Sequence, residues 1–234
     1  MKIAVLSDIH GNSVALEAVL AEVSNAGINR LFVLGDFVGY YYNPDKVLAQ
    51  LAPFETTMIR GNHETMMEVA QYDESSAEKI RAKYGSGVSH ALKKLSEMQI
   101  KQLLALPETT EVTIYGITFF LCHGSPWDNN EYIYPDASEA VLRKCAAQGV
   151  DFVLMGHTHR PFVYTHNGRV VLNAGSVGQP RDTGNLASWA VIDTNNRSIV
   201  QRRTMFDITP VAQEAQQIDP AVPYLAEVLK RKKV

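Results

Sequence analysis

The first 60 residues alternate short apolar runs with amphipathic stretches. Three apolar runs have the length of a β-strand, at residues 3–6, 31–34 and 56–59. Between them, residues 13–26 carry apolar side chains at helical spacing, and Asn43-Pro44 is typical of the start of a second helix. This order of strand, helix, strand, helix, strand predicts parallel strands joined by right-handed crossovers.

Residues 65–106 have a different pattern. They are rich in Met, Ala, Glu, Lys and Leu, and only Gly85 and Gly87 interrupt them before Pro107. This composition favours several short helices over strands. We expect a helical insertion that caps a site formed by the rest of the chain.

The second half of the chain returns to strands. They are predicted at residues 111–114, 117–122, 151–155, 162–166, 169–172, 187–193 and 197–204. Tyr115-Gly116 and Asn167-Gly168 predict tight hairpin turns, and Asp136 with Glu139 resembles a capping box that opens a helix. A further helix is expected near Leu225. No internal repeat or low-complexity linker is visible, so we predict a single α/β domain over residues 1–234.

Composition and charge narrow the class of protein. Hydrophobic residues make up 46% and charged residues 20%, and the formal charge is −3, which disfavours an extended nucleic-acid footprint. No apolar stretch reaches the roughly 20 residues of a membrane span, and the N-terminal run is too short for a signal peptide. The two cysteines, Cys122 and Cys145, provide no disulfide framework. We therefore expect a cytoplasmic protein without membrane partners.

Polar side chains follow several predicted strands at the point where each strand ends. They are Asp8 and His10, Asp36, Asn62 and His63, His123, and His157 and His159. In open α/β sheets, ligands bind outside the carboxyl ends of the strands, so these residues are expected to meet in one crevice. Carboxylates, an amide and imidazoles together suit borderline metals such as Mn, Fe, Ni or Zn. The number of side chains suits two ions if one carboxylate bridges them.

These motifs, in this order, resemble the signature of the calcineurin-like metallophosphoesterase superfamily. The blocks are Asp8-x-His10, Gly35-Asp36, Gly61-Asn62-His63-Glu64, His123 and Gly156-His157-x-His159. The segment Asn-Ala-Gly-Ser-Val-Gly-Gln-Pro-Arg at 173–181 is similar to the compact prokaryotic phosphodiesterase branch. The resemblance implies a four-layer α/β fold, in which two packed mixed β-sheets are flanked by helices.

The resemblance also implies a dinuclear metal centre. One ion would take Asp8, His10 and His159, the other would take Asn62, His123 and His157, and Asp36 would bridge them. The expected cofactors are two divalent ions, with Mn foremost and Fe, Ni, Co or Zn as alternatives. A metal-bridging hydroxide would attack phosphorus in line with the leaving oxygen, and His63 would protonate or stabilise the leaving group. Glu64 follows His63 in the chain, and we expect it to orient the residues of this site.

The expected substrate is a small phosphodiester or nucleotide. We expect Arg181, Asn12 and Tyr40 to contact it, although Arg181 can instead pair with Asp182. The tyrosines that follow two of the motifs either stack on a nucleobase or pack in the fold; they are Tyr40, Tyr41, Tyr42, Tyr132 and Tyr134. His90 and His166 are expected to lie outside the site.

Two other functions remain open from the sequence. Residues 60–64 also resemble the Ser/Thr protein phosphatases, which keeps a protein phosphatase or a phosphomonoesterase as an alternative. A non-catalytic interaction scaffold on the same fold is the alternative of another class. The presence of His63 beside a complete ligand set favours the enzyme, because a scaffold has no need of that histidine.

Overall fold

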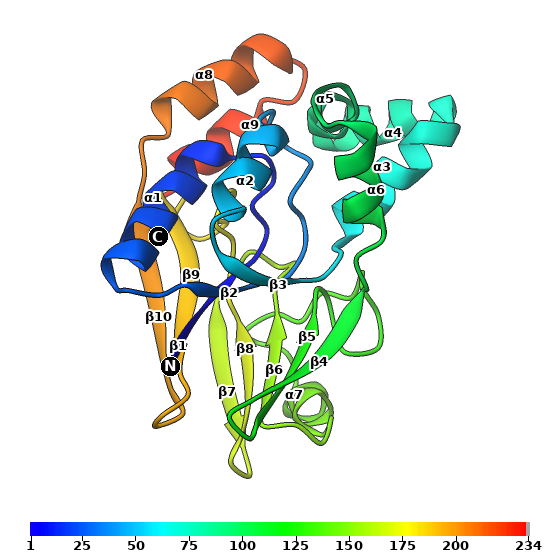
Figure 1. The fold of residues 1–234 in the computed structure, drawn as a ribbon. Helices are drawn as coiled ribbons and strands as arrows, with labels where there is room; N and C mark the ends of the chain where they lie inside the picture. The colour runs from blue at the N-terminus through cyan, green and yellow to red at the C-terminus, as the bar shows by residue number, and fades with distance from the viewer. Residues whose placement is uncertain (233–234) are drawn as a thin grey trace.

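Two five-stranded mixed sheets face each other in the centre of the molecule (Figure 1). The structure is a computed structural model that describes residues 1–232. The first sheet has the order β10(Ser198–Met205), β9(Leu186–Asp193), β1(Lys2–Leu6), β2(Arg30–Val33), β3(Glu55–Met58). The second has the order β4(Thr109–Ile114), β5(Ile117–Cys122), β6(Phe152–Met155), β8(Arg169–Asn173), β7(Phe162–His166). Parallel pairing of β1 with β2 and of β2 with β3 confirms the predicted parallel strands.

Successive side chains of each central strand point to opposite faces of the sheet, and this alternation produces the layers. In β1, Ile3 and Val5 belong to the core between the two sheets, whereas Ala4 and Leu6 belong to the core under the helices. The helices over the first sheet are α1(Ser13–Asn25), α2(Pro44–Leu51), α8(Thr209–Ile218) and α9(Tyr224–Glu227), which continues as a 3₁₀ turn at Val228–Lys230. The helix α7(Glu139–Ala146) covers the second sheet. The predicted four-layer α/β fold is therefore confirmed.

The core between the sheets depends on three aromatic rings. Phe119 stacks on Phe152 with ring centroids 5.2 Å apart and meets Phe32 edge-on at 5.4 Å. Phe119 is fully buried. Phe119→Ala is expected to lower the free energy of unfolding by about 3–5 kcal/mol, because it leaves a cavity between rigid sheets. Urea denaturation measures this loss, and Phe119→Leu, which refills most of the space, is expected to lose clearly less.

Four helices form the predicted insertion, which Figure 1 shows beside the two sheets. They are α3(Asn62–Tyr72), α4(Glu74–Tyr84), α5(Gly87–Lys94) and α6(Glu97–Leu104). The helical character is as predicted, but the first helix begins at Asn62 and not at residue 65. Gly61 takes the N-cap position, and the Glu64 carboxylate accepts the Gly61 N–H at 2.9 Å. Asn62, His63 and Glu64 thus form the first turn of a helix and not a loop.

Two further details of the helices differ from the sequence prediction. The N-cap of α7 is Ser138, whose Oγ accepts the Val141 N–H at 3.4 Å, so the capping box expected at Asp136 is wrong. The helix expected near Leu225 is the short α9 with its 3₁₀ turn, whereas α8, which ends before Asp219-Pro220, was not predicted from the sequence. Within residues 1–232, none of the helices combines the length and the apolar character that a bilayer crossing requires.

Candidate metal centre

Residues at the strand ends adopt an unusual backbone conformation. Six non-glycine residues there have φ between +52° and +64°: Asp8, His10, Asp36, Tyr40, His157 and His159. The left-handed region is unfavourable for side chains other than glycine, and such residues concentrate at functional sites. The conformation turns the chain sharply after β1, β2 and β6.

The first cluster joins the ends of β1 and β6. Ligand-type atoms of Asp8, His10 and His159 all lie within 4.8 Å of one another. His159 Nε2 lies 3.1 Å from Asp8 Oδ1 and 3.1 Å from His10 Nε2. All three side chains are buried. Residues 149 positions apart are therefore brought together, as the strand-end pattern predicts.

The second cluster joins the ends of β2, β5 and β6. It contains Asp36, His123 and His157 within 4.8 Å, and the Asn62 Oδ1 lies 2.9 Å from His123 Nε2. Asp36 Oδ2 lies 3.3 Å from His123 Nε2 and 3.6 Å from His10 Nε2. Asp36 therefore lies between the two clusters, at the position expected for a carboxylate that bridges two ions.

The hydrogen bonds fix which ring nitrogen faces the centre. His10 Nδ1 bonds the Val38 carbonyl at 3.1 Å, His123 Nδ1 bonds that of Leu34 at 2.7 Å, and His159 Nδ1 bonds that of Gln179 at 2.6 Å. A carbonyl only accepts, so each Nδ1 carries a proton and each Nε2 faces the centre, where it can offer a lone pair to a cation once it is unprotonated. His157 instead uses Nε2 for the Asn130 carbonyl at 3.2 Å, which leaves its Nδ1 free.

Convergent lone pairs and carboxylates fit a cation. Asp8 Oδ1 is buried and accepts no hydrogen bond within the described chain. The Nε2 atoms of His10 and His159 are 3.1 Å apart, so their lone pairs would repel each other unless a positive charge lay between them. The side chains present therefore fit the divalent ions that their ligand types suggest.

The electrostatics of the centre agree with this fit. Burial alone would raise the pKa values of Asp8 and Asp36, but the facing imidazoles hold both well below the usual range. Burial lowers the pKa of His159 to about 3 and that of His157 to about 4. Burial also disfavours charge on His123, yet Asp36 outweighs it and raises the pKa to about 10. Two anionic carboxylates and mostly neutral imidazoles are close to the protonation state that metal binding requires.

His63 lies beside these clusters. Its backbone N–H donates to Asp36 Oδ1 at 2.8 Å, and its ring lies 4.6 Å from that of His10. The ring is buried, and Nδ1 has no hydrogen-bond partner in residues 1–232. Burial lowers its pKa to about 3, so the ring is neutral at pH 7. Gly39 leaves room for this ring, since a Cβ at that position would collide with Nδ1.

Glu64 supports the candidate metal centre through hydrogen bonds to the backbone. Its carboxylate accepts four backbone N–H groups, from Asp36 at 2.9 Å, Phe37 at 2.8 Å, Val38 at 3.1 Å and Gly61 at 2.9 Å. Burial and the nearby Asp36 raise its pKa to about 7. The carboxylate joins the start of α3 to the loop after β2. It thereby sets the position of Asp36, a role that the sequence spacing alone did not reveal.

Loss of this carboxylate is expected to destabilise the protein. Glu64→Ala leaves four buried N–H donors without a partner, and we expect the free energy of unfolding to fall by about 3–5 kcal/mol. Urea denaturation of metal-stripped protein measures this loss apart from any effect of bound metal. Glu64→Gln keeps one acceptor oxygen and is expected to lose less. Equal stability of the Ala variant and the parent would contradict a supporting role.

The glycine-rich loop after β8 holds two residues of the first cluster. Ser176 Oγ donates to the Asp8 carbonyl at 2.7 Å, and the Gly178 N–H donates to the same oxygen at 3.0 Å. The Gln179 carbonyl orients His159. The loop therefore positions the centre through its backbone, which side-chain motifs do not show.

The residues expected to contact substrate have different surroundings. Arg181 does not pair with Asp182, which binds Arg203; its Nη2 donates to Tyr40 OH at 3.1 Å. The Tyr40 ring lies 4.5 Å from that of His10. Asn12 is the N-cap of α1 and donates to the Gly178 carbonyl at 2.7 Å, so both polar atoms of its side chain are already bonded.

The other tyrosines divide into two groups. Tyr41 and Tyr42 are fully buried and bond Leu225 and Asp219, so their rings pack in the fold and do not stack on a base. Tyr132 and Tyr134 are partly exposed and stack with centroids 5.8 Å apart. The Tyr132 ring covers His157 at 4.0 Å.

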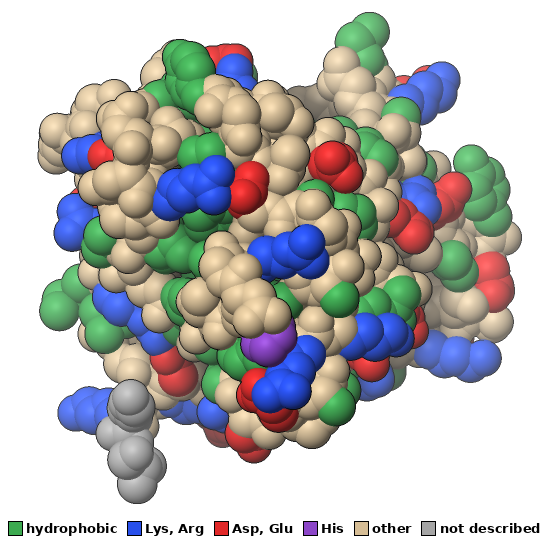
Figure 2. All heavy atoms as spheres, turned by 90° about the horizontal axis from the view of Figure 1, so that it is seen from below, with side chains coloured by type: hydrophobic (Ala, Val, Ile, Leu, Met, Phe, Trp, Pro, Cys, Tyr) green, Lys and Arg blue, Asp and Glu red, His purple; other side chains and the backbone are tan. Residues whose placement is uncertain are grey.

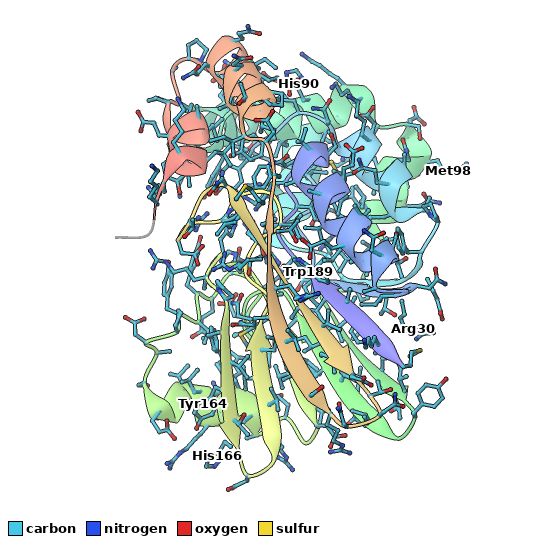
Figure 3. The ribbon with its side chains drawn as sticks, turned by 90° about the vertical axis from the view of Figure 1, so that its left-hand side faces the viewer. Arg30, His90, Met98, Tyr164, His166 and Trp189 are labelled. Atoms are coloured by element: carbon cyan, nitrogen blue, oxygen red, sulfur yellow. The ribbon has the colours of Figure 1, made fainter. Side chains whose placement is uncertain are left out.

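Tyr84 of α4 is a site residue that the sequence did not indicate. Its ring lies 5.4 Å from that of His63, so the insertion reaches the centre. Two histidines remain outside, as expected. Figure 3 shows His90 and His166 at opposite ends of the molecule.

Comparisons with known proteins agree with this geometry. Residues 1–197 match the family described as the calcineurin-like phosphoesterase superfamily domain. The uncharacterised protein MJ0912 of Methanocaldococcus jannaschii is 33% identical, with 88% of each chain covered. A metallophosphoesterase of Sphaerobacter thermophilus is 25% identical with a TM-score of 0.77, covering 97% of this chain and 100% of its own. The hypothetical protein PH1004 of Pyrococcus horikoshii has the same fold, with a TM-score of 0.83, 22% identity and 98% of each chain covered.

Proposed function

Because the chain belongs to the calcineurin-like phosphoesterase superfamily, we propose that it hydrolyses a small phosphodiester or nucleotide with two divalent ions. One ion would be held by Asp8, His10 and His159, the other by Asn62, His123 and His157, with Asp36 shared. The observation that carries the proposal is the convergence of lone pairs from three buried imidazoles on two buried carboxylates. When bound, two such ions polarise a phosphoryl oxygen and activate a water molecule.

The protein's own residues would do the rest. His63 offers a neutral N–H beside the centre, suited to the oxygen that leaves phosphorus as negative charge develops there. Arg181 bonds Tyr40, whose ring packs against that of His63, and the two residues would hold a non-bridging oxygen of the phosphoryl group. We leave Asn12 out of the substrate contacts, because its amide is buried and already bonded.

A small substrate fits the charge of the chain better than a nucleic-acid polymer. The formal charge is −3, and acidic and basic side chains are intermixed on the face that Figure 2 shows. A polymer needs a continuous run of basic side chains along its phosphates. The complete set of candidate ligands, together with His63, supports an enzyme over a scaffold.

Three narrower proposals accompany this function. Manganese is the first ion to test, because the ligand set mixes carboxylate and amide oxygens with imidazoles. We propose one domain over residues 1–234, since Tyr41 and Tyr42 bond residues beyond position 197. The free thiols of Cys122 and Cys145 support a cytoplasmic location.

The comparison of two substrates tests the reaction class. Metal-stripped protein is reloaded separately with Mn, Ni, Zn or Mg and given bis(4-nitrophenyl) phosphate or 4-nitrophenyl phosphate. Turnover of the diester at higher kcat/KM than the monoester is expected with at least one ion. Turnover of the monoester alone would favour the phosphomonoesterase alternative.

A further inference from the structure

A cavity of about 640 Å³ opens beside the candidate metal centre. Its wall is formed by Tyr134, Pro135, Asp136, Thr158, Arg160, Arg181 and Arg231. Thr158 and Arg160 flank His159 in the chain and both line the cavity, so the cavity lies next to the segment that provides a residue of the first cluster. A volume of this size accommodates part of a small ligand.

The charge of this cavity is opposite in sign to that of the chain. Three arginines and one aspartate give a formal charge of 3 − 1 = +2, in a protein of −3. Elsewhere in the described chain, five arginines pair with carboxylates and three do not; the paired ones are Arg30, Arg60, Arg143, Arg197 and Arg203, and the unpaired ones are Arg81, Arg169 and Arg202. In residues 1–232, Arg160, Arg181 and Arg231 have no carboxylate oxygen within 4.0 Å. Arg160 and Arg231 are exposed and Arg181 is half-buried, so the three positive charges that line this cavity are free to meet an anion that enters it.

Arg181 connects the cavity with the centre. Its Nη2 donates to Tyr40 OH at 3.1 Å, while its Nε is buried and has no hydrogen-bond partner in the described chain. Tyr40 in turn packs on His10 and His63, with centroids 4.5 Å and 4.8 Å away. Arg181 is half-buried as a residue, but a buried N–H without a partner, such as that of its Nε, is unfavourable unless a ligand accepts it.

The other two arginines complete the wall. The Arg231 guanidinium lies 5.2 Å from the centroid of the Tyr224 ring, which restricts its motion. The backbone N–H of Arg160 donates to Thr158 Oγ1 at 3.3 Å, which holds the backbone of Arg160 against the residue between the two histidines. A phosphate or a carboxylate is the group that several guanidinium forks recognise best.

We propose that this cavity binds a second anionic group of the substrate. The substrate class is then a small phosphodiester in which one arm carries a further phosphate or carboxylate. This proposal rests on the function proposed above and names the substrate class of that site. Arg160 and Arg231 are the residues that determine the specificity, and Arg181 lies between the second anion and the reacting phosphoryl group.

Two matched diesters test the proposal on the metal-loaded full chain. Both release 4-nitrophenolate; the other arm is propyl in one and 3-phosphopropyl in the other. The phosphopropyl diester is expected to have a kcat/KM about 10- to 100-fold higher, the range of hydrogen bonds to charged groups. The double variant Arg160→Gln/Arg231→Gln is expected to reduce this ratio to about 1. Arg197→Gln, which removes an arginine at the β9–β10 turn, serves as the control and is expected to keep the ratio.

The outcomes separate this proposal from the proposed function. No hydrolysis of either diester would contradict the phosphodiesterase itself. Hydrolysis of both at equal kcat/KM, or a preference that survives in the double variant, would overturn the anion cavity alone. Inorganic sulfate competes with any phosphoryl group at the metal centre, so it is expected to raise KM for both diesters, but more for the phosphopropyl diester. An equal rise in KM for the two diesters, or an extra rise that persists in the double variant, would overturn the anion cavity.

Discussion

Asp36→Asn is expected to lower the turnover of bis(4-nitrophenyl) phosphate by at least about 10³-fold, because it removes the charge that both proposed metal positions would share. The carboxylate lies 3.6 Å from His10 Nε2 and 3.3 Å from His123 Nε2, and no other carboxylate lies between the clusters in residues 1–232. Asn has the same shape and keeps an acceptor for the His63 N–H. The fold should therefore persist while the affinity for metal falls.

Metal content and kcat/KM are measured on the same samples of the Asp36→Asn variant. Glu17→Gln, which removes an exposed carboxylate from α1, is the control and should keep both. A variant at Asp36 that binds two ions and retains more than about a tenth of the turnover would show that the two positions do not share this carboxylate.

His63→Asn is expected to lower turnover by roughly 10²–10⁴-fold while leaving the metal content intact. A ring nitrogen of His63 lies within 4.8 Å of ligand-type atoms of His10 and Asp36, but neither set of proposed ligands needs it. Its effect should depend on the leaving group, since a hydrogen bond to the leaving oxygen matters most when that oxygen is strongly basic. The loss should therefore be larger for an alkyl leaving group than for 4-nitrophenolate.

The leaving-group series separates this role from a structural one. His166→Asn, at the turn between β7 and β8, is the matched control and should leave the rates unchanged. An equal loss for all leaving groups, or a fall in bound metal, would assign His63 to positioning the centre instead.

Much of this architecture is visible in the sequence because it is determined locally. Apolar runs of four to six residues specify the buried strands, and the alternation within β1 specifies both of the cores that it touches. The carboxyl ends of these strands lie at one edge, so residues such as Asp8 and His157 can be grouped before any coordinates are known. The same motifs carried the resemblance that the comparisons now support.

An orienting role was expected for Glu64, but the partners of the supporting residues could not be predicted, because they depend on contacts between distant segments. Glu64 bonds the loop after β2, 26 to 28 positions away. Tyr84 reaches His63 only because α4 folds back against α3. The carbonyls that fix the imidazole tautomers belong to no sequence motif. Local propensity also could not separate Asp136 from Ser138 as the cap of α7, since both residue types cap helices well.

The strained backbone explains why these supports are needed. A non-glycine residue in the left-handed region is unfavourable by about 1–3 kcal/mol, and Asp8, His10 and Asp36 are three of six at this site. Hydrogen bonds from the glycine-rich loop and from Glu64 offset part of that strain. The side chains are thereby held in place before any ion binds.

Titration of manganese into metal-stripped protein tests the two-metal phosphodiesterase most directly. Bound manganese and the hydrolysis of bis(4-nitrophenyl) phosphate are measured at each point of the same titration. Two ions per chain are expected, with turnover rising mainly as the second position fills. Saturation at one ion with full turnover would contradict the dinuclear centre, and two bound ions without turnover of any phosphoester would contradict the enzyme.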